Sequence, residues 1–154
     1  MPNKPHRLPR EAYKGRTVAY TLSIFDRRIV FVTQVAFDAM VRFLRQAAAE
    51  HNVLVPIFCF MPDHAHLLVI PADEDVNTID FINRFKSLSG IWLYSNGRNK
   101  WQPRAWDDII GSSEDWRAHA KYIALNPVRA EFVESYTDYP YLGSLHGEVM
   151  DIFL

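Results

Sequence analysis

The sequence predicts an α+β fold in which one antiparallel sheet carries helices on one face. Apolar runs rich in β-branched residues alternate with segments in which apolar residues recur at helical spacing. Two of the apolar runs are separated only by Pro62 and Asp63, a pair typical of the tight turn of a hairpin. The 154 residues, 49% of them hydrophobic, suffice for one domain with a single core.

The first half of the chain predicts a strand, a helix and a hairpin. Residues 17–25 have the composition of a strand. A helix is expected over 34–51, ended by Asn52, because apolar residues there recur three and four positions apart. Strands over 53–61 and 64–70 form the hairpin. The apolar residues that define the helix are Phe37, Met40, Val41, Leu44, Ala47 and Ala48.

The second half predicts two more helices and one more strand. A helix is expected over 78–94, marked by Ile82, Phe85, Leu88 and Trp92 and closed by the left-handed turn that Asn96-Gly97 favours. A strand follows over 104–110, and a third helix over 114–125. Hydroxyls and acids at the start of that helix suit its orphan amides and its positive end. These residues are Ser112, Ser113, Glu114 and Asp115.

The first six elements follow the order β-α-β-β-α-β, which is that of a ferredoxin-like (RRM-like) core. The seventh element is an additional C-terminal helix. We expect residues 1–16 to form a basic N-terminal arm, residues 17–145 a single domain, and residues 146–154 a C-terminal tail.

The single cysteine, Cys59, excludes an intramolecular disulfide, which fits a reducing compartment. It lies in an apolar run and is expected to be a small buried residue. The N-terminus lacks the apolar segment of a secretory signal, and no apolar stretch approaches the length that a membrane span requires. We therefore expect a cytoplasmic protein that does not enter a membrane.

The charge is unevenly distributed, although the net charge of −1 alone does not indicate a nucleic-acid partner. Basic residues outnumber acidic ones in residues 1–30, residues 84–106 contain no acid, and residues 131–154 contain no Lys or Arg. Aromatic residues between basic ones suit phosphates and unpaired bases. The alternative is a solvated face whose aromatics belong to the core. The candidate DNA-binding residues are Arg7, Arg10, Lys14, Arg16, Arg84, Lys86, Arg98, Lys100, Arg104, Trp92 and Trp101.

His64 and His66 lie two residues apart at the start of the strand predicted over 64–70. Residues i and i+2 of a strand point to the same face and lie about 7 Å apart along the backbone. Two neutral imidazoles on one rigid face make half of a divalent-metal site. The alternative is a pair of ordinary structural histidines, one partly buried and one solvated.

The third predicted helix places Tyr122 and Asn126 four residues apart, so a continuous helix presents them on one face. The amide oxygen of Asn126 could complete a site begun by the two histidines, with Tyr122 one turn away. Three alternatives remain open. Tyr122 could be a core aromatic, Asn126 could cap a short turn that begins at Pro127, and His119 could be the third ligand.

Two signatures resemble a known family. Residues 61–69, Met-Pro-Asp-His-Ala-His-Leu-Leu-Val, resemble the Met-Pro-Asn/Asp-His-x-His-Leu-Leu signature of single-tyrosine HUH transposases. Residues 122–130, Tyr-Ile-Ala-Leu-Asn-Pro-Val-Arg-Ala, resemble their Tyr-Ile-x-x-Asn-Pro-Val-Arg-Ala signature. Residues 101–102 resemble the Trp-Gln before the last strand, and residues 139–144 resemble a closing Tyr-Pro-Trp-Ser-Ser with Tyr141 for Trp. Within the IS200-like family, the resemblance is strongest to the REP-associated tyrosine transposases.

The resemblance implies roles for four residues. His64 and His66 would be the metal ligands, with the small Ala65 where the family has a large hydrophobic residue. Asn126 would be the third ligand, and the ion would be Mg²⁺ or Mn²⁺. Tyr122 would attack a phosphodiester of single-stranded DNA, which yields a 5′-phosphotyrosine and a free 3′-hydroxyl.

We therefore expect a metal-dependent single-stranded DNA endonuclease and strand transferase that acts at hairpin-flanked sites. It would be associated with the nucleoid when bound to DNA. The resemblance implies a homodimer if the chain follows the insertion-sequence relatives and a monomer if it follows the REP-associated ones, and the sequence alone does not decide. Two alternatives are a protein that binds single-stranded or hairpin nucleic acid without cutting it, and a metal hydrolase that uses water.

Overall fold

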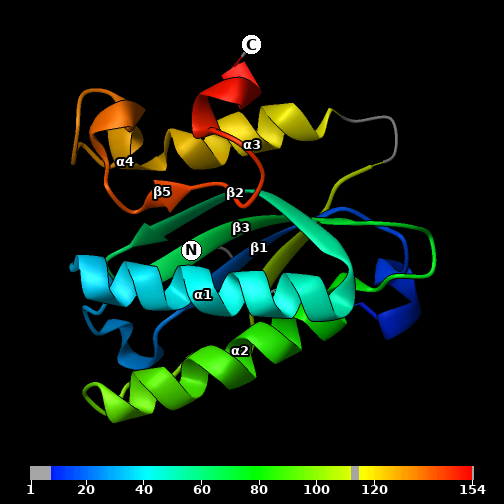
Figure 1. The fold of residues 1–154 in the computed structure, drawn as a ribbon, viewed down its shortest axis with the longest axis horizontal. Coiled ribbons are helices and arrows are strands. Elements are labelled where there is room, and N and C mark those ends of the chain that lie inside the picture. Colours follow the sequence, from blue (N-terminus) through cyan, green and yellow to red (C-terminus); the bar gives the residue numbers. More distant parts are fainter. Residues whose placement is uncertain (1–7, 112–114, 154) are drawn as a thin grey trace.

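The computed structural model describes residues 8–111 and 115–153, and within them a five-stranded antiparallel sheet (Figure 1). The strands lie in the order β4-β1-β3-β2-β5, and every neighbouring pair is antiparallel. The first four have the order of a ferredoxin-like core, which confirms the predicted fold class. Their bounds are β1 Val18–Ser23, β2 Val53–Met61, β3 His64–Pro71, β4 Trp106–Ile109 and β5 Leu142–Gly143.

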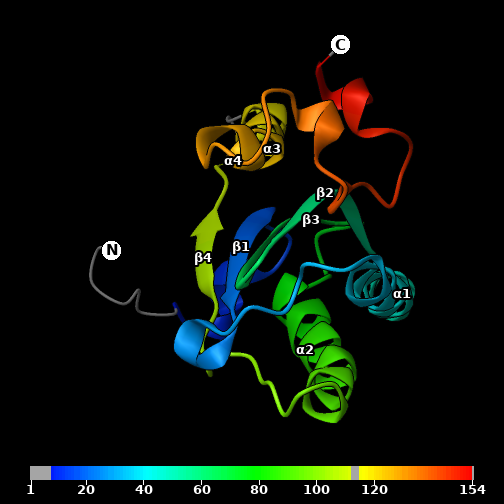
Figure 2. The same cartoon turned by 90° about the vertical axis from the view of Figure 1, so that its left-hand side faces the viewer.

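Helices α1 (Gln34–His51) and α2 (Thr78–Ser95) cover one face of the sheet (Figure 2). The Thr33 side chain caps α1 by accepting from the Ala36 amide, and Asn52 ends the helix in the left-handed conformation at φ +53°. Alternate strand residues supply the core on this side, because successive side chains of a strand point to opposite faces. In β1 and β3 these are Val18, Tyr20, Leu22, Ala65, Leu67 and Val69.

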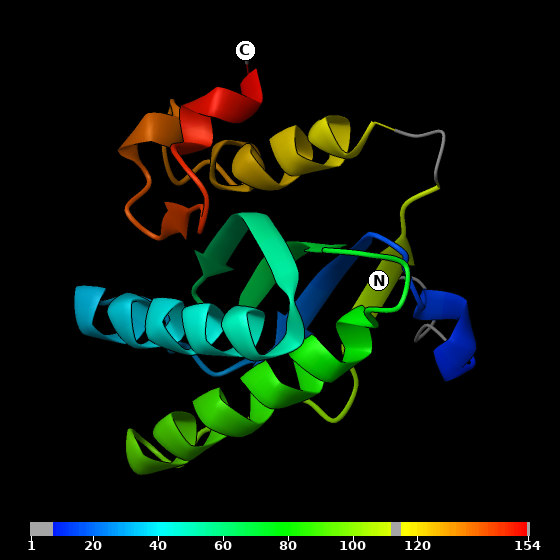
Figure 3. The ribbon, with the colours of Figure 1, turned by 45° about the vertical axis from the view of Figure 1, so that its right-hand side comes forward.

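The opposite face is covered by α3 (Trp116–Ala124) and α4 (Asn126–Arg129), so the sheet lies between two layers (Figure 3). A second apolar cluster joins this face to α3, and Leu68 of β3 belongs to it. His64 and His66 alternate with the residues of the first core and therefore point toward the α3 side. The other members of the cluster are Ile57, Cys59, Met61, Ile110, Ala120, Ile123, Ala124 and Ile152.

The N-terminal segment differs from the expected arm, because its described part is packed onto the domain. Residues Arg10–Tyr13 form a 3₁₀ helix, and Tyr13 is completely buried. The Tyr13 hydroxyl donates to Asp107, and Asn77 donates to the Arg10 carbonyl. The Gly15 amide donates to the Val76 carbonyl. A boundary at residue 17 therefore does not separate these residues from the fold.

The chain from residue 104 onward also departs from the prediction in detail. Strand β4 is shorter than the expected 104–110, and α3 is capped by Asp115, which accepts from the Arg117 amide. The expected caps Ser112 and Ser113 lie outside the described residues. The C-terminal tail is packed, because the 3₁₀ helix Val149–Phe153 buries Ile152 against the α3 side. Among the described residues, no helix has the length and apolar character to cross a bilayer.

Candidate active site

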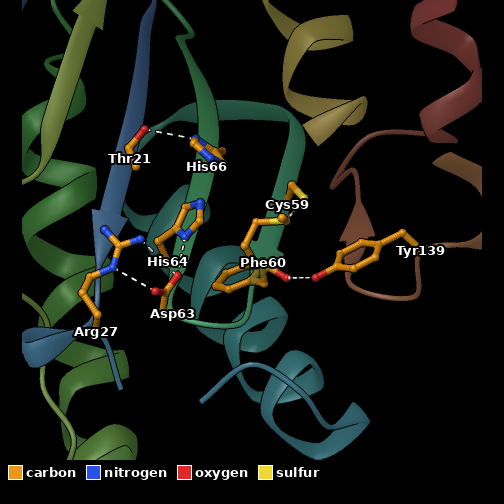
Figure 4. A network of polar contacts seen from close by, with 9 residues as sticks. Thr21, Arg27, Cys59, Phe60, Asp63, His64, His66 and Tyr139 are labelled. Atoms are coloured by element: carbon orange, nitrogen blue, oxygen red, sulfur yellow. Dashed lines mark hydrogen bonds and ion pairs between the residues drawn. The ribbon is translucent and has the colours of Figure 1, made fainter. Parts of the chain in front are cut away.

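The two histidines of β3 lie side by side in the centre of the sheet, on the face toward α3. In the strand register His66 lies between Thr21 of β1 and Cys59 of β2. The ring centroids of His64 and His66 are 4.8 Å apart, and the rings are nearly perpendicular, at 88°. Figure 4 shows both rings on the same side of the strand. The predicted arrangement of the pair is therefore confirmed.

One nitrogen of each ring is already held by the protein (Figure 4). Nδ1 of His64 donates to Asp63 Oδ1 over 2.6 Å, and Asp63 in turn accepts two bonds from Arg27, of 2.9 and 3.3 Å. Nδ1 of His66 lies 3.0 Å from the Thr21 hydroxyl. Metal-binding histidines usually donate their other N–H to such an oxygen, which fixes the tautomer. The arrangement leaves both Nε2 atoms available and fits a divalent metal.

The electrostatics of the site keep the His66 ring unprotonated. Burial lowers the pKa of His66 to about 3, assisted by the positive charges of His64 and Arg129. The ring is therefore neutral at neutral pH and offers a lone pair. Burial alone would raise the pKa of Asp63, but its bonds from Arg27 and His64 outweigh this effect and hold that pKa below its ordinary value. Asp63 is therefore ionised and can accept the hydrogen bond from His64 Nδ1.

Tyr122 lies on α3 and is 64% exposed, so it is not a core aromatic. The guanidinium of Arg129 lies over its ring, 3.6 Å from the centroid. The same guanidinium donates to the Tyr122 carbonyl and to Asn126 Oδ1, each over 2.6 Å. Arg129 therefore joins the tyrosine to the candidate third ligand.

Tyr122 and Asn126 do not share a continuous helix. Helix α3 ends at Ala124, Leu125 stands at φ −89° and ψ 0°, and α4 begins at Asn126. Pro127 causes the break, because it has no N–H to continue the α3 hydrogen bonds. Asn126 does not act as a cap either, since α4 has no side-chain cap. Its Nδ2 is buried and has no hydrogen-bond partner among the described residues.

Sequence reasoning missed the role of Arg129, although the residue stands in the quoted signature. Its positive charge acts on the pKa of both His66 and Cys59, so the α4 end lies near the paired histidines. The spacing between Asn126 and Arg129 could have indicated this contact. Arg129 follows Asn126 by three residues, the separation at which side chains of a helix meet. Thr21, Asp63 and Arg27 were also missed, because hydrogen bonds between strands and turns leave no periodic pattern.

The aromatic candidates for DNA binding do not form a free stacking surface. Trp101 is only 7% exposed, its indole N–H donates to Ser89 Oγ, and its ring packs between Phe31 and Phe85. The interpretation of Trp101 as a base-stacking residue is corrected: it belongs to the core. Trp92 is partly buried and packs against the same core.

Several basic candidates are engaged within the protein. Arg10 pairs with Asp80, and Arg84 pairs with Glu50, both at 2.6 Å. Lys14 lies 3.8 Å from Asp75, and Lys86 donates to the carbonyls of residues 102 and 103. Arg16 and Arg104 are exposed, Arg7 lies outside the described residues, and Arg98 and Lys100 line a separate pocket.

The described ranges, 8–111 and 115–153, hold no group of three or more His, Cys, Asp or Glu placed to bind a metal. Asn126, the third ligand that the resemblance implies, is an amide and falls outside that set. His119 stands on α3 one turn before Tyr122 and is partly buried.

A family model, a protein of similar sequence and a solved structure of similar fold all relate this chain to transposases. The family described as Transposase IS200 like matches residues 17–123, a span that includes both histidines and Tyr122 but stops before Asn126. The chain is 30% identical to the REP-associated tyrosine transposase of Escherichia coli (strain K12) over 141 residues, which is 88% of this chain and 80% of that protein. The fold is similar to the solved structure of a REP-associated tyrosine transposase bound to a REP hairpin. The TM-score is 0.75 at 22% identity, and the match covers 90% of this chain and 81% of the other.

Proposed function

Because the chain belongs to the family of IS200-like transposases, we propose that it cuts and rejoins single-stranded DNA at hairpin-flanked sites through Tyr122. One observation carries the proposal. Two histidines with held Nδ1 atoms present their free nitrogens on the sheet face that α3 covers, and α3 bears the exposed Tyr122. Hairpin DNA is proposed as substrate because the relative with the similar fold is bound to a REP hairpin.

The proposed step exchanges one phosphate ester for another. The Tyr122 oxygen forms a bond to phosphorus and loses its proton to water, while the bond from phosphorus to the 3′-oxygen breaks and that oxygen takes a proton from water. The products are a 5′-phosphotyrosine and a free 3′-hydroxyl. A 3′-hydroxyl of a second strand reverses the exchange, so the rejoining step needs no nucleotide triphosphate.

His64, His66 and Asn126 are the residues that would hold Mg²⁺ or Mn²⁺. The ion would supply positive charge that polarises the scissile phosphate toward attack by the phenol. The carbonyl oxygen of Asn126 has two lone pairs, so it can accept from Arg129 and still face a metal. Asp63 and Thr21 orient the two imidazoles. Arg129 orders Tyr122 and Asn126 across the break at Leu125.

End-labelled DNA tests the chemistry directly. A single-stranded oligonucleotide with a hairpin is incubated with the protein and Mn²⁺. A 5′-phosphotyrosine retains the 3′ fragment, so a 3′-labelled oligonucleotide should migrate with the protein in a denaturing gel. A 5′-labelled oligonucleotide should yield a shorter strand that a polymerase extends.

Tyr122→Phe should abolish the adduct and leave hairpin binding unchanged, because it removes only an exposed hydroxyl. Tyr94→Phe is a matched control, since Tyr94 is 63% exposed and lies on α2. An adduct formed by the Tyr122→Phe variant at the normal rate would exclude Tyr122 as nucleophile. Binding of hairpins without any adduct in the unmodified protein would favour a protein that only binds DNA.

A further inference from the structure

A pocket of ≈ 290 Å³ lies outside the candidate active site, between the turn that follows β1 and the segment that precedes β4. The Phe25 amide donates to the Lys100 carbonyl over 2.8 Å, which joins the two segments. Figure 2 shows the turn after β1 in light blue beside the yellow-green chain that runs from α2 to β4. The lining residues are Phe25, Asp26, Arg28, Arg98, Asn99 and Lys100.

The lining combines positive charge with an exposed aromatic ring. Among the described residues, no ion pair joins Arg28, Arg98 or Lys100 to a carboxylate. Phe25 is 48% exposed, and the Lys100 ammonium lies 4.4 Å from its ring centroid. Cations beside an aromatic face are the elements with which proteins hold a phosphate and a stacked base. The Asp26 carboxylate adds an acceptor for the N–H groups of a base.

The backbone of the pocket is held in an uncommon conformation. Asp26, Arg27 and Arg98 have φ values of +62°, +51° and +55°, in the left-handed region that non-glycine residues rarely adopt. Only two other non-glycine residues in the described part of the chain have positive φ, namely Asn52 and Glu131. Strain of this kind gathers where the protein uses a particular arrangement of side chains. Two of these three residues, Asp26 and Arg98, line the pocket.

The pocket is connected to the candidate active site through the turn that follows β1. Arg27, between Asp26 and Arg28 in the turn, donates to Asp63 and does not line the pocket. Asp63 accepts in turn from His64, as Figure 4 shows. The Ile24 amide donates to the Asp63 carbonyl. These bonds place the turn beside the paired histidines.

We propose that the pocket binds one unstacked nucleotide of the substrate strand, next to the phosphate held at the histidines. Its base lies against Phe25, and its phosphate lies among Arg28, Arg98 and Lys100. The small volume suits a single nucleotide and not a duplex, whose bases are stacked and whose faces are closed. The inference rests on the proposed function and extends it, because it assigns a site that reads the single-stranded flank of a hairpin.

Binding of two hairpins tests this proposal. One hairpin is blunt, and the other carries a short single-stranded extension at both ends. Fluorescence anisotropy should give a tighter complex with the extended hairpin. Phe25→Leu and Arg28→Ala should each weaken that complex about tenfold and leave the blunt hairpin unaffected, since a stacked base contributes strongly to single-strand affinity. Arg42→Ala is the matched control, because Arg42 also lies over an aromatic ring but on α1.

Abasic substitution locates the nucleotide. One abasic position in the extension should weaken binding to the unmodified protein and should have no further effect in the Phe25→Leu variant. Two results would overturn the pocket assignment alone: equal affinity of the unmodified protein for both hairpins, or a preference for the extended hairpin that survives in the Phe25→Leu and Arg28→Ala variants. Failure of the unmodified protein to bind either hairpin would overturn the proposed function together with the pocket assignment.

Discussion

Removal of the Arg129 guanidinium is expected to disable cleavage without unfolding the protein. The group makes three contacts: one with the Tyr122 ring, one with the Tyr122 carbonyl and one with Asn126 Oδ1. An exposed cation–π contact is worth about 0.5–1 kcal/mol, and a net hydrogen bond about 1 kcal/mol. These terms are not additive, so we expect a loss of about 2 kcal/mol in the ordered arrangement of Tyr122 and Asn126.

A loss of that size reduces the equilibrium constant for the ordered arrangement about 30-fold, because about 1.4 kcal/mol corresponds to a factor of ten. The rate of adduct formation under single-turnover conditions should fall by up to that factor in Arg129→Ala. The midpoint of the Mn²⁺ dependence should rise, since Asn126 loses the group that orients its oxygen. Thermal unfolding should change little, because Arg129 is exposed. Arg129→Lys should not restore the rate, since an ammonium cannot reproduce the planar fork.

Arg117→Ala is the matched control, because Arg117 lies over the Trp116 ring at 4.7 Å on the same helix as Tyr122. It should cleave at the normal rate. Cleavage by the Arg129→Ala variant at or above the normal rate, with an unchanged Mn²⁺ midpoint, would refute the positioning role. Arg129 would then either slow cleavage or have no effect on it.

Three further expectations follow from the described contacts. His64→Ala and His66→Ala should each abolish Mn²⁺ binding measured by calorimetry. Asn126→Ala should weaken Mn²⁺ binding less, because water can replace a neutral oxygen ligand. Unchanged affinity in either histidine variant would exclude the metal site. Tyr13→Ala should lower the free energy of unfolding by about 3 kcal/mol or more, because it leaves a cavity at a fully buried position. A loss under about 1 kcal/mol in a urea titration would show that the segment around Tyr13 is not part of the core. Burial raises the pKa of Cys59 to about 12, so Cys59 should resist alkylation in the folded protein near neutral pH and react only on unfolding. Fast alkylation of Cys59 in the folded protein would contradict its buried environment.

Periodicity was enough to predict the core of the fold. The β-α-β-β-α-β order and the facing of His64 and His66 follow from spacings of two and of three to four residues, which the backbone geometry imposes. Periodicity does not say on which face a last helix packs, so the placement of α3 opposite α1 and α2 was not predicted. Strand β5 has two residues and carries no pattern. Charge around Trp101 suggested a surface ring, but neighbouring charges do not determine where an indole points.

The candidate site was predicted in its residue types and not in its connections. Tyr122 and Asn126 were placed by a helix that the structure breaks at Leu125, where Pro127 removes a donor. Arg129, Asp63 and Thr21 act through hydrogen bonds between separate elements, and such bonds depend on the register of the sheet. The pocket beside Phe25 brings together two turns that are distant in the sequence, and the left-handed Arg98 is not of a residue type that marks such a turn.

The short strand β5 has a consequence for the stability of the chain against aggregation. Strand β2 is a long apolar strand, and β5 pairs with it at Phe58 and Cys59. Flanking bonds extend the cover, because Phe60 donates to the Tyr141 carbonyl and Leu145 donates to the Val55 carbonyl. An uncovered apolar edge is a template for pairing with another chain. Chains that end before residue 139 should therefore associate through β2, and during synthesis this edge remains open until residues 141–145 have left the ribosome.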